Sequence, residues 1–258
     1  MPLFYKEYGD QRAPLMVFIH GGGVSGWMWD KQVQYFTHFH CIVPDLPQQG
    51  KSRQDTTFTI HDSASKILEL IEEKGAGKRI IVIGFSLGAQ ILLAMLGLKP
   101  HVIDDAIINS ALVRPIPFSK LLTRSMVLTL PLIKNKTFSH IQAKSMYIPD
   151  DYLETYYQEN RLLRPDVFAR ISEENMAFRI PENFRNAGSR MLVTVGEKER
   201  KVMKESLIDI LRGNSNCKGI IFPEVGHGIS LAKPDFFNQL VENWVLNGKI
   251  PDEVQEVI

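Results

Sequence analysis

Short apolar runs alternate with longer segments of helical periodicity along most of the chain. The runs are rich in β-branched residues, as buried parallel strands are, and span Leu15–Ile19, Cys41–Val43, Ile80–Ile83, Ala106–Ile108, Met191–Val195 and Gly219–Phe222. The helical patterns lie at Trp27–Phe36, Ile60–Lys74, Leu87–Leu98, Lys201–Leu211 and Pro234–Leu246, and Phe4–Tyr8 adds an antiparallel edge strand. This alternation predicts an α/β fold, a mostly parallel twisted sheet with helices on both faces.

The alternation stops between residues 114 and 185. No run in this stretch resembles a buried strand; it carries helical patterns around Leu121–Leu130, Asp151–Asn160 and Asp166–Phe178, separated by prolines. The stretch is too long and too regularly patterned for a loop. We therefore expect a core domain formed by residues 1–113 and 186–258, with residues 114–185 inserted as a helical unit.

The insertion contains aromatic residues and methionines that are suited to line an apolar cleft: Met126, Phe138, Met146, Tyr147, Tyr152, Tyr156, Phe168, Met176 and Phe178. Such side chains often serve to bury an element against its neighbours. We expect about two thirds of them to pack the insertion against the core and the others to face a cleft.

The segment Ile80–Leu98 contains no charged residue. An uncharged segment of this length is also typical of a membrane span. However, the residue types change midway from Ile and Val to Leu, Ala and Met, which indicates a buried strand that leads into a core helix. At the change stands Gly84-Phe-Ser-Leu-Gly88, the Gly-x-Ser-x-Gly pattern of a nucleophile elbow. Such a turn strains the serine backbone, and its glycines let strand and helix pack closely. Ser86 is the predicted nucleophile.

A serine nucleophile needs a general base, usually a histidine held by a carboxylate. Of the seven histidines, His227 lies between two glycines directly after the last predicted parallel strand, and it is the predicted base. The other histidines fall at the starts or flanks of strands and helices. His38 and His40 form a pair, but no third ligand follows in a recognisable pattern, so we expect no metal site.

The turn after Met191–Val195 supplies the acid. It reads Gly196-Glu-Lys-Glu199, so Glu197 and Glu199 compete for the role. Glu199 is preferred because three residues after the glycine leave room for the chain to turn back over the sheet. The resulting order of serine, acid and histidine is the one that the elbow predicts. The alternative for Glu199 is a solvated residue capping the next helix.

An acyl intermediate also needs donors for its oxyanion. The glycine-rich loop at residues 21–26 follows the first parallel strand, and the backbone N–H groups of Gly22 and Leu87 are the predicted donors. The glycines of this loop also fit the dinucleotide pattern G-x-G-x-x-G, with Asp45 as the candidate ribose ligand. That alternative stays open on the spacing alone.

The 258-residue chain has an ordinary globular composition, with 44% hydrophobic and 23% charged residues. Its formal net charge of +1 gives no electrostatic case for binding nucleic acid or an anionic membrane. The first nine residues lack the pattern of a secretory signal, and Cys41 and Cys217 lie beside predicted strands, as buried thiols do. We expect a cytoplasmic protein with no nucleic-acid partner and no integral membrane segment.

Five patterns together resemble those of the α/β-hydrolase superfamily, nearly end to end. In chain order they are His20-Gly21-Gly22 with Trp29 downstream, Pro44-Asp45-Leu-Pro-Gln-Gln-Gly50-Lys-Ser52, Gly84-Phe-Ser-Leu-Gly88, Gly196-Glu-Lys-Glu199 and Gly226-His227. By this resemblance Asp45 is a turn residue, and residues 114–185 are a helical cap. Serine at position 86 argues against the haloalkane dehalogenase and epoxide hydrolase branches, which use an aspartate nucleophile. Two features depart from the family: it usually carries Asp where Glu199 stands, and the N-terminus is one strand short of the usual eight.

The resemblance implies a carboxylesterase-like serine hydrolase that cleaves an ester or related acyl bond of a small, apolar molecule through an acyl-enzyme, with no cofactor. Such scaffolds also perform C–C bond hydrolysis, lyase or cofactor-free perhydrolase chemistry with the same residues. A hydrolase-like sensor with very little turnover is a further alternative.

Overall fold

The computed structural model describes residues 3–52, 57–251 and 254–257. Its strands form one sheet in the order β1-β3-β2-β4-β5-β6-β7-β8. The two edge pairs, β1 with β3 and β7 with β8, are antiparallel, and the pairs between them are parallel. The strands span Tyr5–Tyr8, Leu15–Ile19, His40–Pro44, Ile80–Phe85, Asp105–Asn109, Arg190–Gly196, Cys217–Phe222 and Gln255–Val257.

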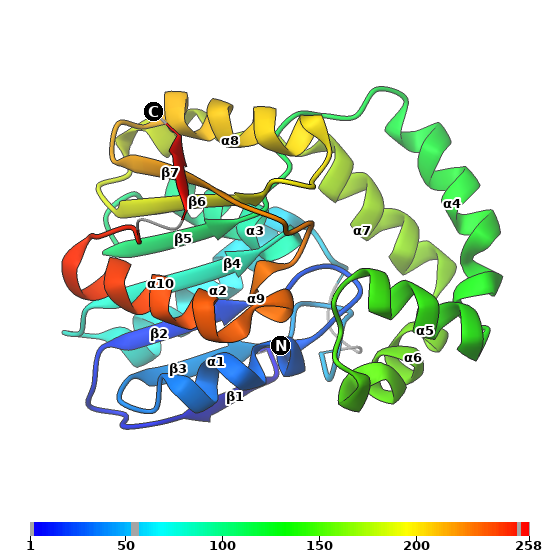
Figure 1. The fold of residues 1–258 in the computed structure, drawn as a ribbon, viewed down its shortest axis with the longest axis horizontal. Helices are drawn as coiled ribbons and strands as arrows, with labels where there is room; N and C mark the ends of the chain where they lie inside the picture. The colour runs from blue at the N-terminus through cyan, green and yellow to red at the C-terminus, as the bar shows by residue number, and fades with distance from the viewer. Residues whose placement is uncertain (1–2, 53–56, 252–253, 258) are drawn as a thin grey trace.

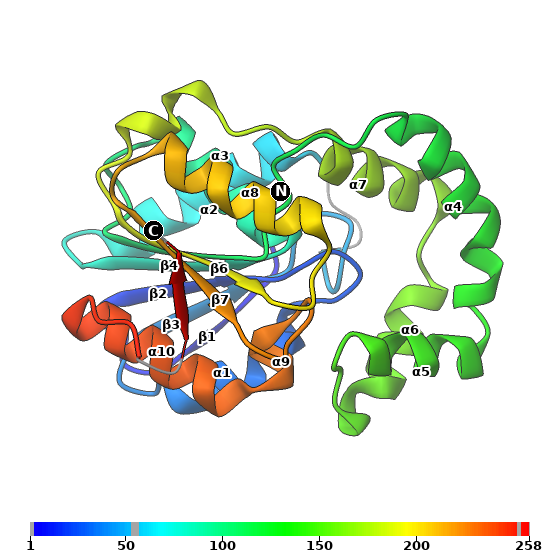
Figure 2. The same cartoon turned by 45° about the horizontal axis from the view of Figure 1, so that its top comes forward.

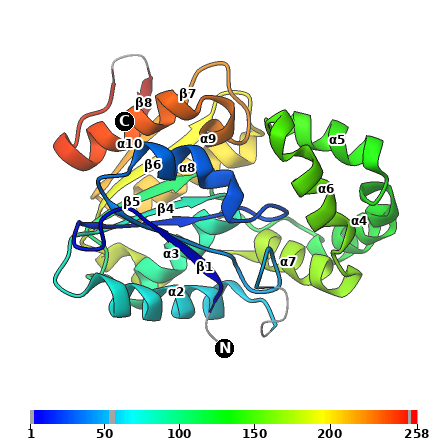
Figure 3. The same cartoon turned by 90° about the horizontal axis from the view of Figure 1, so that it is seen from below.

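Helices cover both faces of this sheet (Figures 1 and 3). Helices α2 (Ile60–Gly75), α3 (Leu87–Leu98) and α8 (Lys201–Gly213) pack on one face, and α1 (Asp30–Tyr35) and α10 (Pro234–Asn247) pack on the other. The predicted α/β architecture is confirmed.

Strand β2 shows why the inner strands are continuous apolar runs. Leu15, Val17 and Ile19 join the core on the α2 and α3 side, whereas Met16 and Phe18 join the core on the α1 and α10 side. All five side chains are fully buried. Because successive side chains of a strand point to opposite faces, a sheet covered on both faces needs an apolar residue at every position.

The segment between β5 and β6 holds four helices that extend beyond the sheet (Figures 1 and 2). They are α4 (Ser119–Ile133), α5 (Lys136–Ser145), α6 (Leu153–Arg161) and α7 (Pro165–Ala177), with 3₁₀ turns at Asp150–Tyr152 and Glu182–Asn186. The patterns at α4, α6 and α7 were predicted, and α5 was not. Residues 114–185 are called the cap below, and their division from the core at these limits stays a prediction.

Differences from the predicted elements are confined to short segments. The helix expected at Trp27–Phe36 is a 3₁₀ turn, Gly26–Trp29, that continues into α1. The short helix α9 (Ile229–Ala232) and the edge strand β8 were not predicted. The sheet reaches eight strands because β8 adds an edge strand at the end opposite to β1, where none was predicted.

The uncharged segment Ile80–Leu98 forms β4 and α3, as predicted. Within the described part of the chain, no helix is both long and apolar enough to span a membrane.

Candidate active site

Ser86 lies at the sharp turn between β4 and α3, with φ +54° and ψ −112°. This left-handed region is costly for any residue except glycine, so the surrounding contacts must hold the serine there. Its backbone N–H donates to the carbonyl of Asn109 on β5, at 2.8 Å. A Cβ on Gly84 would collide with the carbonyl of Gly88, and one on Gly88 with that of Ile19. The geometry explains why glycines flank this serine.

Glu199 and His227 are brought together from the turns that follow β6 and β7. His227 Nδ1 lies 2.8 Å from Glu199 Oε2. The glutamate side chain is almost completely buried, whereas that of the histidine is 39% exposed. A buried carboxylate at Nδ1 favours the tautomer that carries its proton on Nδ1, leaving Nε2 as an acceptor.

The second carboxylate oxygen of Glu199 is also bound. Oε1 accepts hydrogen bonds from the Gly196 N–H at 2.9 Å and the Ser110 hydroxyl at 2.7 Å. Burial favours the neutral acid, but the hydrogen bonds from His227, Gly196 and Ser110 outweigh it, so the pKa of Glu199 lies below its usual value. The carboxylate is therefore ionised at neutral pH.

Glu197, the competing acid, points elsewhere. Its Oε2 accepts the backbone N–H of Glu224 at 2.9 Å, in an exposed position. Ser110, by contrast, was missed from the sequence. It follows β5 with φ +58°, and no local pattern indicates a contact with a glutamate 89 residues away.

The imidazole of His227 packs against the residue before the candidate nucleophile. Its ring centroid lies 4.9 Å from that of Phe85. Among the described residues, Ser86 and His227 make no hydrogen bond to each other; the ring contact joins the imidazole to Phe85, the residue that precedes Ser86.

Gly22 and Leu87, the expected oxyanion donors, come from adjoining segments. A Cβ on Gly22 would lie 3.6 Å from the Leu87 side chain. As the first residue of α3, Leu87 has no intrahelical acceptor for its N–H. His20 fixes the Gly22 loop: its Nε2 accepts the Leu46 N–H at 2.9 Å, and its Nδ1 donates to the Gly21 carbonyl at 2.7 Å. Burial lowers the pKa of His20, so the ring stays neutral in this role.

Asp45 is engaged by the backbone of its own turn region. Oδ1 accepts the Gly26 N–H and Oδ2 accepts the Lys51 N–H, each at 2.8 Å. Both oxygens therefore hold the glycine loop and the 45–52 turn together, which is the structural role that the resemblance implies. The carboxylate is not directed to a ribose.

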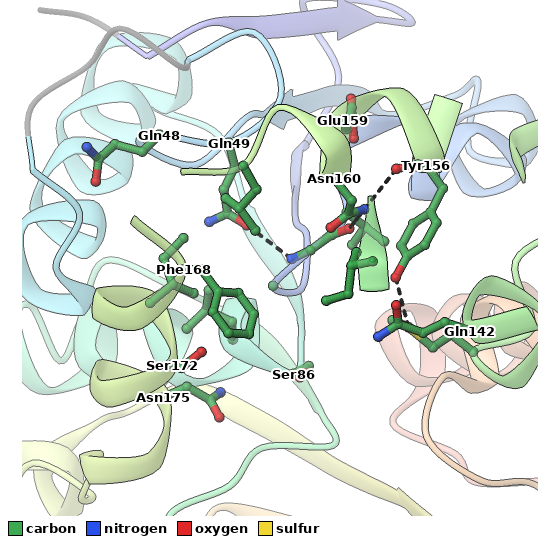
Figure 4. Close-up of a pocket in the computed structure, with 18 of the residues that line it drawn as sticks. Gln48, Gln49, Ser86, Gln142, Tyr156, Glu159, Asn160, Phe168, Ser172 and Asn175 are labelled. Carbon is green, nitrogen blue, oxygen red and sulfur yellow. Dashed lines mark hydrogen bonds between the residues drawn. The ribbon is translucent and has the colours of Figure 1, made fainter. Parts of the chain in front are cut away.

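A cavity of about 290 Å³ lies between this site and the cap. Figure 4 shows Ser86 at one end, with Phe168, Ser172 and Asn175 of α7 on one side and Tyr156 and Gln142 on the other. Its wall also includes Gly22 and Leu87. Five of the nine aromatic and methionine residues noted in the cap line it, namely Met126, Met146, Tyr156, Phe168 and Met176. Of these five, Tyr156 belongs to the buried cluster that contains residues of α1 and α10, and Met146 packs against it, so lining the cavity does not exclude packing against the core.

The described residues contain no group of three or more His, Cys, Asp or Glu side chains placed to hold a metal ion. His40, one of the pair noted above, lies 2.6 Å from Glu7 through Nε2 and 2.9 Å from Lys78 through Nδ1.

Comparison with known proteins places the chain in a family. The model of the alpha/beta hydrolase family matches residues 16–240. The chain belongs to this family. A superfamily protein of Gibberella zeae is 28% identical over 109 residues, which cover 42% of this chain and 38% of that relative. Lipase 1 of Psychrobacter immobilis is 23% identical over 237 residues, covering 87% of this chain and 74% of the lipase.

Solved structures show the same fold. A putative non-heme bromoperoxidase of Mycobacterium tuberculosis has a TM-score of 0.78 at 19% identity and covers 96% of this chain and 97% of its own. A thermophilic esterase of Thermogutta terrifontis has a TM-score of 0.75 at 19% identity, with 94% and 92% covered. At this level of identity the likeness concerns the fold alone.

The cap of this α/β hydrolase is bonded to the core around the cavity. Glu159 on α6 accepts the Ser25 hydroxyl at 2.8 Å and the Trp27 indole N–H at 3.0 Å. Asn160 donates to the Gly23 carbonyl at 3.0 Å. On α7, Asn175 donates to Gln90 of α3, at 2.9 Å. These bonds hold two cap helices over the glycine-rich loop at residues 21–26 and the helix that follows Ser86.

Another contact joins the cap to the loop that carries His227. The Tyr147 hydroxyl accepts the Gly226 N–H at 3.0 Å, and its ring lies beside Gly228. Tyr147 has φ +60°, an unusual value for a bulky residue. The sequence marked it only as one aromatic residue among several.

Proposed function

We propose that this hydrolase cleaves a carboxylic ester, or a related acyl bond, of a small and largely apolar molecule through an acyl-enzyme on Ser86. The observation that carries the proposal is the hydrogen-bonded pair of buried Glu199 and partly exposed His227 next to a strained serine elbow. Lipase 1, a relative that aligns with 87% of this chain, bears the name of an ester-cleaving enzyme.

In the proposed reaction, Ser86 Oγ attacks the carbonyl carbon of the ester. His227 takes the hydroxyl proton on Nε2, and Glu199 stabilises the resulting imidazolium through Nδ1–H. The imidazolium then returns the proton to the departing alcohol as the C–O bond of the ester breaks. Water, deprotonated by the same imidazole, attacks the acyl-serine and releases the carboxylic acid and Ser86. No metal or cofactor takes part.

The negative oxygen of each tetrahedral intermediate is bound by the N–H groups of Gly22 and Leu87. Both groups belong to fixed backbone, one held by the neutral His20 and the other at the start of α3. Donors that are already oriented need little reorganisation when the charge develops, which is why such pairs lower the barrier.

The cavity supplies the pocket for one part of the ester. Its apolar wall includes Met126, Ile133, Met146 and Phe168, whereas Gln142, Asn160 and Ser172 add polar groups. A wall of this kind favours an apolar chain with a few polar atoms. We propose that the substrate reaches Ser86 from the cap side.

Replacing the nucleophile tests the mechanism. Ser86→Ala is expected to lower turnover of p-nitrophenyl acetate by about 10³-fold or more, because no hydroxyl remains to form the acyl-enzyme. Ser172→Ala is the matched control, because this serine lines the same cavity but belongs to α7 of the cap and not to the elbow; it should keep most of the activity. Full activity in the Ser86 variant, with an unchanged circular dichroism spectrum, would refute the mechanism.

A fluorophosphonate probe separates ester hydrolysis from the alternatives. Rapid labelling of Ser86, together with turnover on a panel of short and long acyl esters, is the expected result. Rapid labelling with negligible turnover on every ester would contradict esterase function and favour a ligand-binding protein or another reaction of the same residues.

A further inference from the structure

Helix α4 is apolar on two opposite sides. Leu121, Leu128 and Leu132 recur at spacings of seven and four, which places them on one side of the helix, and they are 68%, 81% and 51% exposed. On the opposite side Thr123 and Leu130 are buried. Large apolar side chains gathered on an exposed face normally mark a surface that binds something.

Phe118 extends this exposed surface. It stands at the N-terminus of α4 and is 84% exposed. Phe118, Leu121, Leu128 and Leu132 are called the α4 face below. Helix α4 lies at the outer edge of the cap, with α7 between it and the sheet (Figures 1 and 2). The α4 face therefore points away from the cavity, which Met126 and Ile133 of the same helix line from within.

The charged side chains of the same region are all of one sign. Residues 115–149 contain Lys120, Arg124, Lys134, Lys136 and Lys144 but no aspartate or glutamate. With a total of +1, the rest of the chain carries a formal net charge of −4. Lys136 pairs with Glu154 and Lys144 with Asp150. Among the described residues, no carboxylate lies within ion-pair distance of the other three.

We propose that the α4 face and the cations beside it form a docking site for an anionic lipid bilayer. Exposed leucines and a phenylalanine flanked by lysine and arginine are the combination that binds a helix to such a surface. The balanced charge of the whole chain hides this site, because the positive charge is gathered in one segment of the cap. Docking there sets the cap of the proposed esterase against the lipid.

A second copy of the chain fits the α4 face less well. In a symmetric dimer the same patch contacts itself, so the cations of residues 115–149 would face one another across a low-dielectric contact. An anionic bilayer neutralises these charges and buries the leucines together.

Co-sedimentation with large unilamellar vesicles tests the docking site. At low salt the protein is expected to bind vesicles of phosphatidylcholine and phosphatidylglycerol, mixed 3:1, about tenfold or more tightly than vesicles of phosphatidylcholine alone. High salt should weaken the binding to the anionic vesicles, because it screens the attraction between the lipid and the cations.

Two double variants locate the surface. Leu121→Ser/Leu128→Ser and Lys120→Gln/Arg124→Gln should each weaken binding to the anionic vesicles by about tenfold. Their matched controls, Leu98→Ser/Leu246→Ser and Lys218→Gln/Lys249→Gln, replace exposed residues outside the cap and should bind as the unchanged protein does. Turnover of the soluble ester should be the same in all four, since none of these residues lines the cavity.

Several outcomes would overturn the proposal. Protein that stays in the supernatant with both kinds of vesicle excludes bilayer docking, and equal binding to neutral vesicles excludes the role of the cations. A dimer in sedimentation velocity that Leu121→Ser/Leu128→Ser abolishes, without vesicle binding, would assign the α4 face to a second copy. Because binding is measured without catalysis, these results are independent of the esterase proposal.

Discussion

Glu199 reaches His227 although a glutamate is one methylene longer than the aspartate usual in the family. The turn after β6 brings its side chain back over Gly196, whose N–H, only three residues away, donates to Oε1. Oε2 is then left facing the imidazole. The turn thus accommodates the extra methylene, and the Ser110 hydroxyl donates a second hydrogen bond to Oε1.

The proposed role of Glu199 predicts a specific kinetic defect. Glu199→Gln keeps the size of the side chain but removes the charge that stabilises the imidazolium and fixes the tautomer of His227. We expect kcat for p-nitrophenyl acetate to fall by about 10²–10⁴-fold, with KM changed by less than about threefold. Steady-state kinetics at neutral pH provide the measurement.

Glu197→Gln is the matched control for this change. It alters the other glutamate of the same turn, whose carboxylate caps the Glu224 N–H and not the imidazole. Its kcat should remain close to that of the unchanged protein. Equal losses in the two variants would show that the turn, and not the Glu199 charge, is what the site requires.

At the scale of single elements, α3 and α5 show what the sequence could and could not predict. Helix α3 has the bounds that its pattern predicted, because the elbow glycines mark its start and an uncharged Leu and Ala run fills it. Helix α5 was missed although Asn135 caps it, accepting the Phe138 N–H at 3.1 Å. Its exposed apolar residues, Phe138 and Ile141, obscure the amphipathic period that would reveal a helix.

Contacts between distant elements were beyond sequence reasoning for a different reason. The catalytic candidates carry local patterns, a glycine-flanked serine and a glycine-flanked histidine. Ser110 and Tyr147 carry none, because their partners lie 89 and 79 residues away and their left-handed backbones arise from the packed fold. A single sequence shows residue types and spacing, not long-range pairing.

The Tyr147 contact predicts that the cap positions the histidine loop. Tyr147→Phe removes the hydroxyl that accepts the Gly226 N–H, next to His227. The loss of one such bond is worth about 1 kcal/mol, so we expect kcat/KM to fall about fivefold, mainly through kcat, with little change in the melting temperature. Ester kinetics and differential scanning fluorimetry measure the two effects.

Tyr157→Phe serves as the comparison on the same part of the cap. Tyr157 lies edge-on to the His140 ring, away from the histidine loop, and its variant should match the parent protein in kcat. A fall in kcat of the same size there would assign the effect to cap packing in general.

Across the whole molecule, the sheet separates the candidate site from a cluster of charges. Ser86, Ser110 and Glu199 follow the carboxyl ends of β4, β5 and β6. At the amino ends of the same strands, buried Asp105 binds the guanidinium groups of Arg79 and Arg190, each at 2.8 Å through Nε. Both arginines also donate to the Val245 carbonyl on α10. The cluster therefore ties three central strands to a covering helix, one strand length from the site.

This separation predicts that Asp105 serves stability and not catalysis. Arg79 binds one oxygen of the Asp105 carboxylate and Arg190 binds the other. Asp105→Asn removes the negative charge that the two arginines share. Since both guanidinium groups are partly exposed, solvent screens some of the loss, and we expect about 2 kcal/mol of destabilisation. For a chain of this size that lowers the melting temperature by about 4–8 °C. Asp62→Asn, which removes the charge of a partly exposed i,i+4 ion pair with Lys66 on α2, should lower it by less than about 2 °C. At 20 °C the kcat of both variants should equal that of the parent, because about 15–20 Å of strand separates Asp105 from the elbow. A large loss of kcat in folded Asp105→Asn protein would show instead that the two ends of the sheet are coupled.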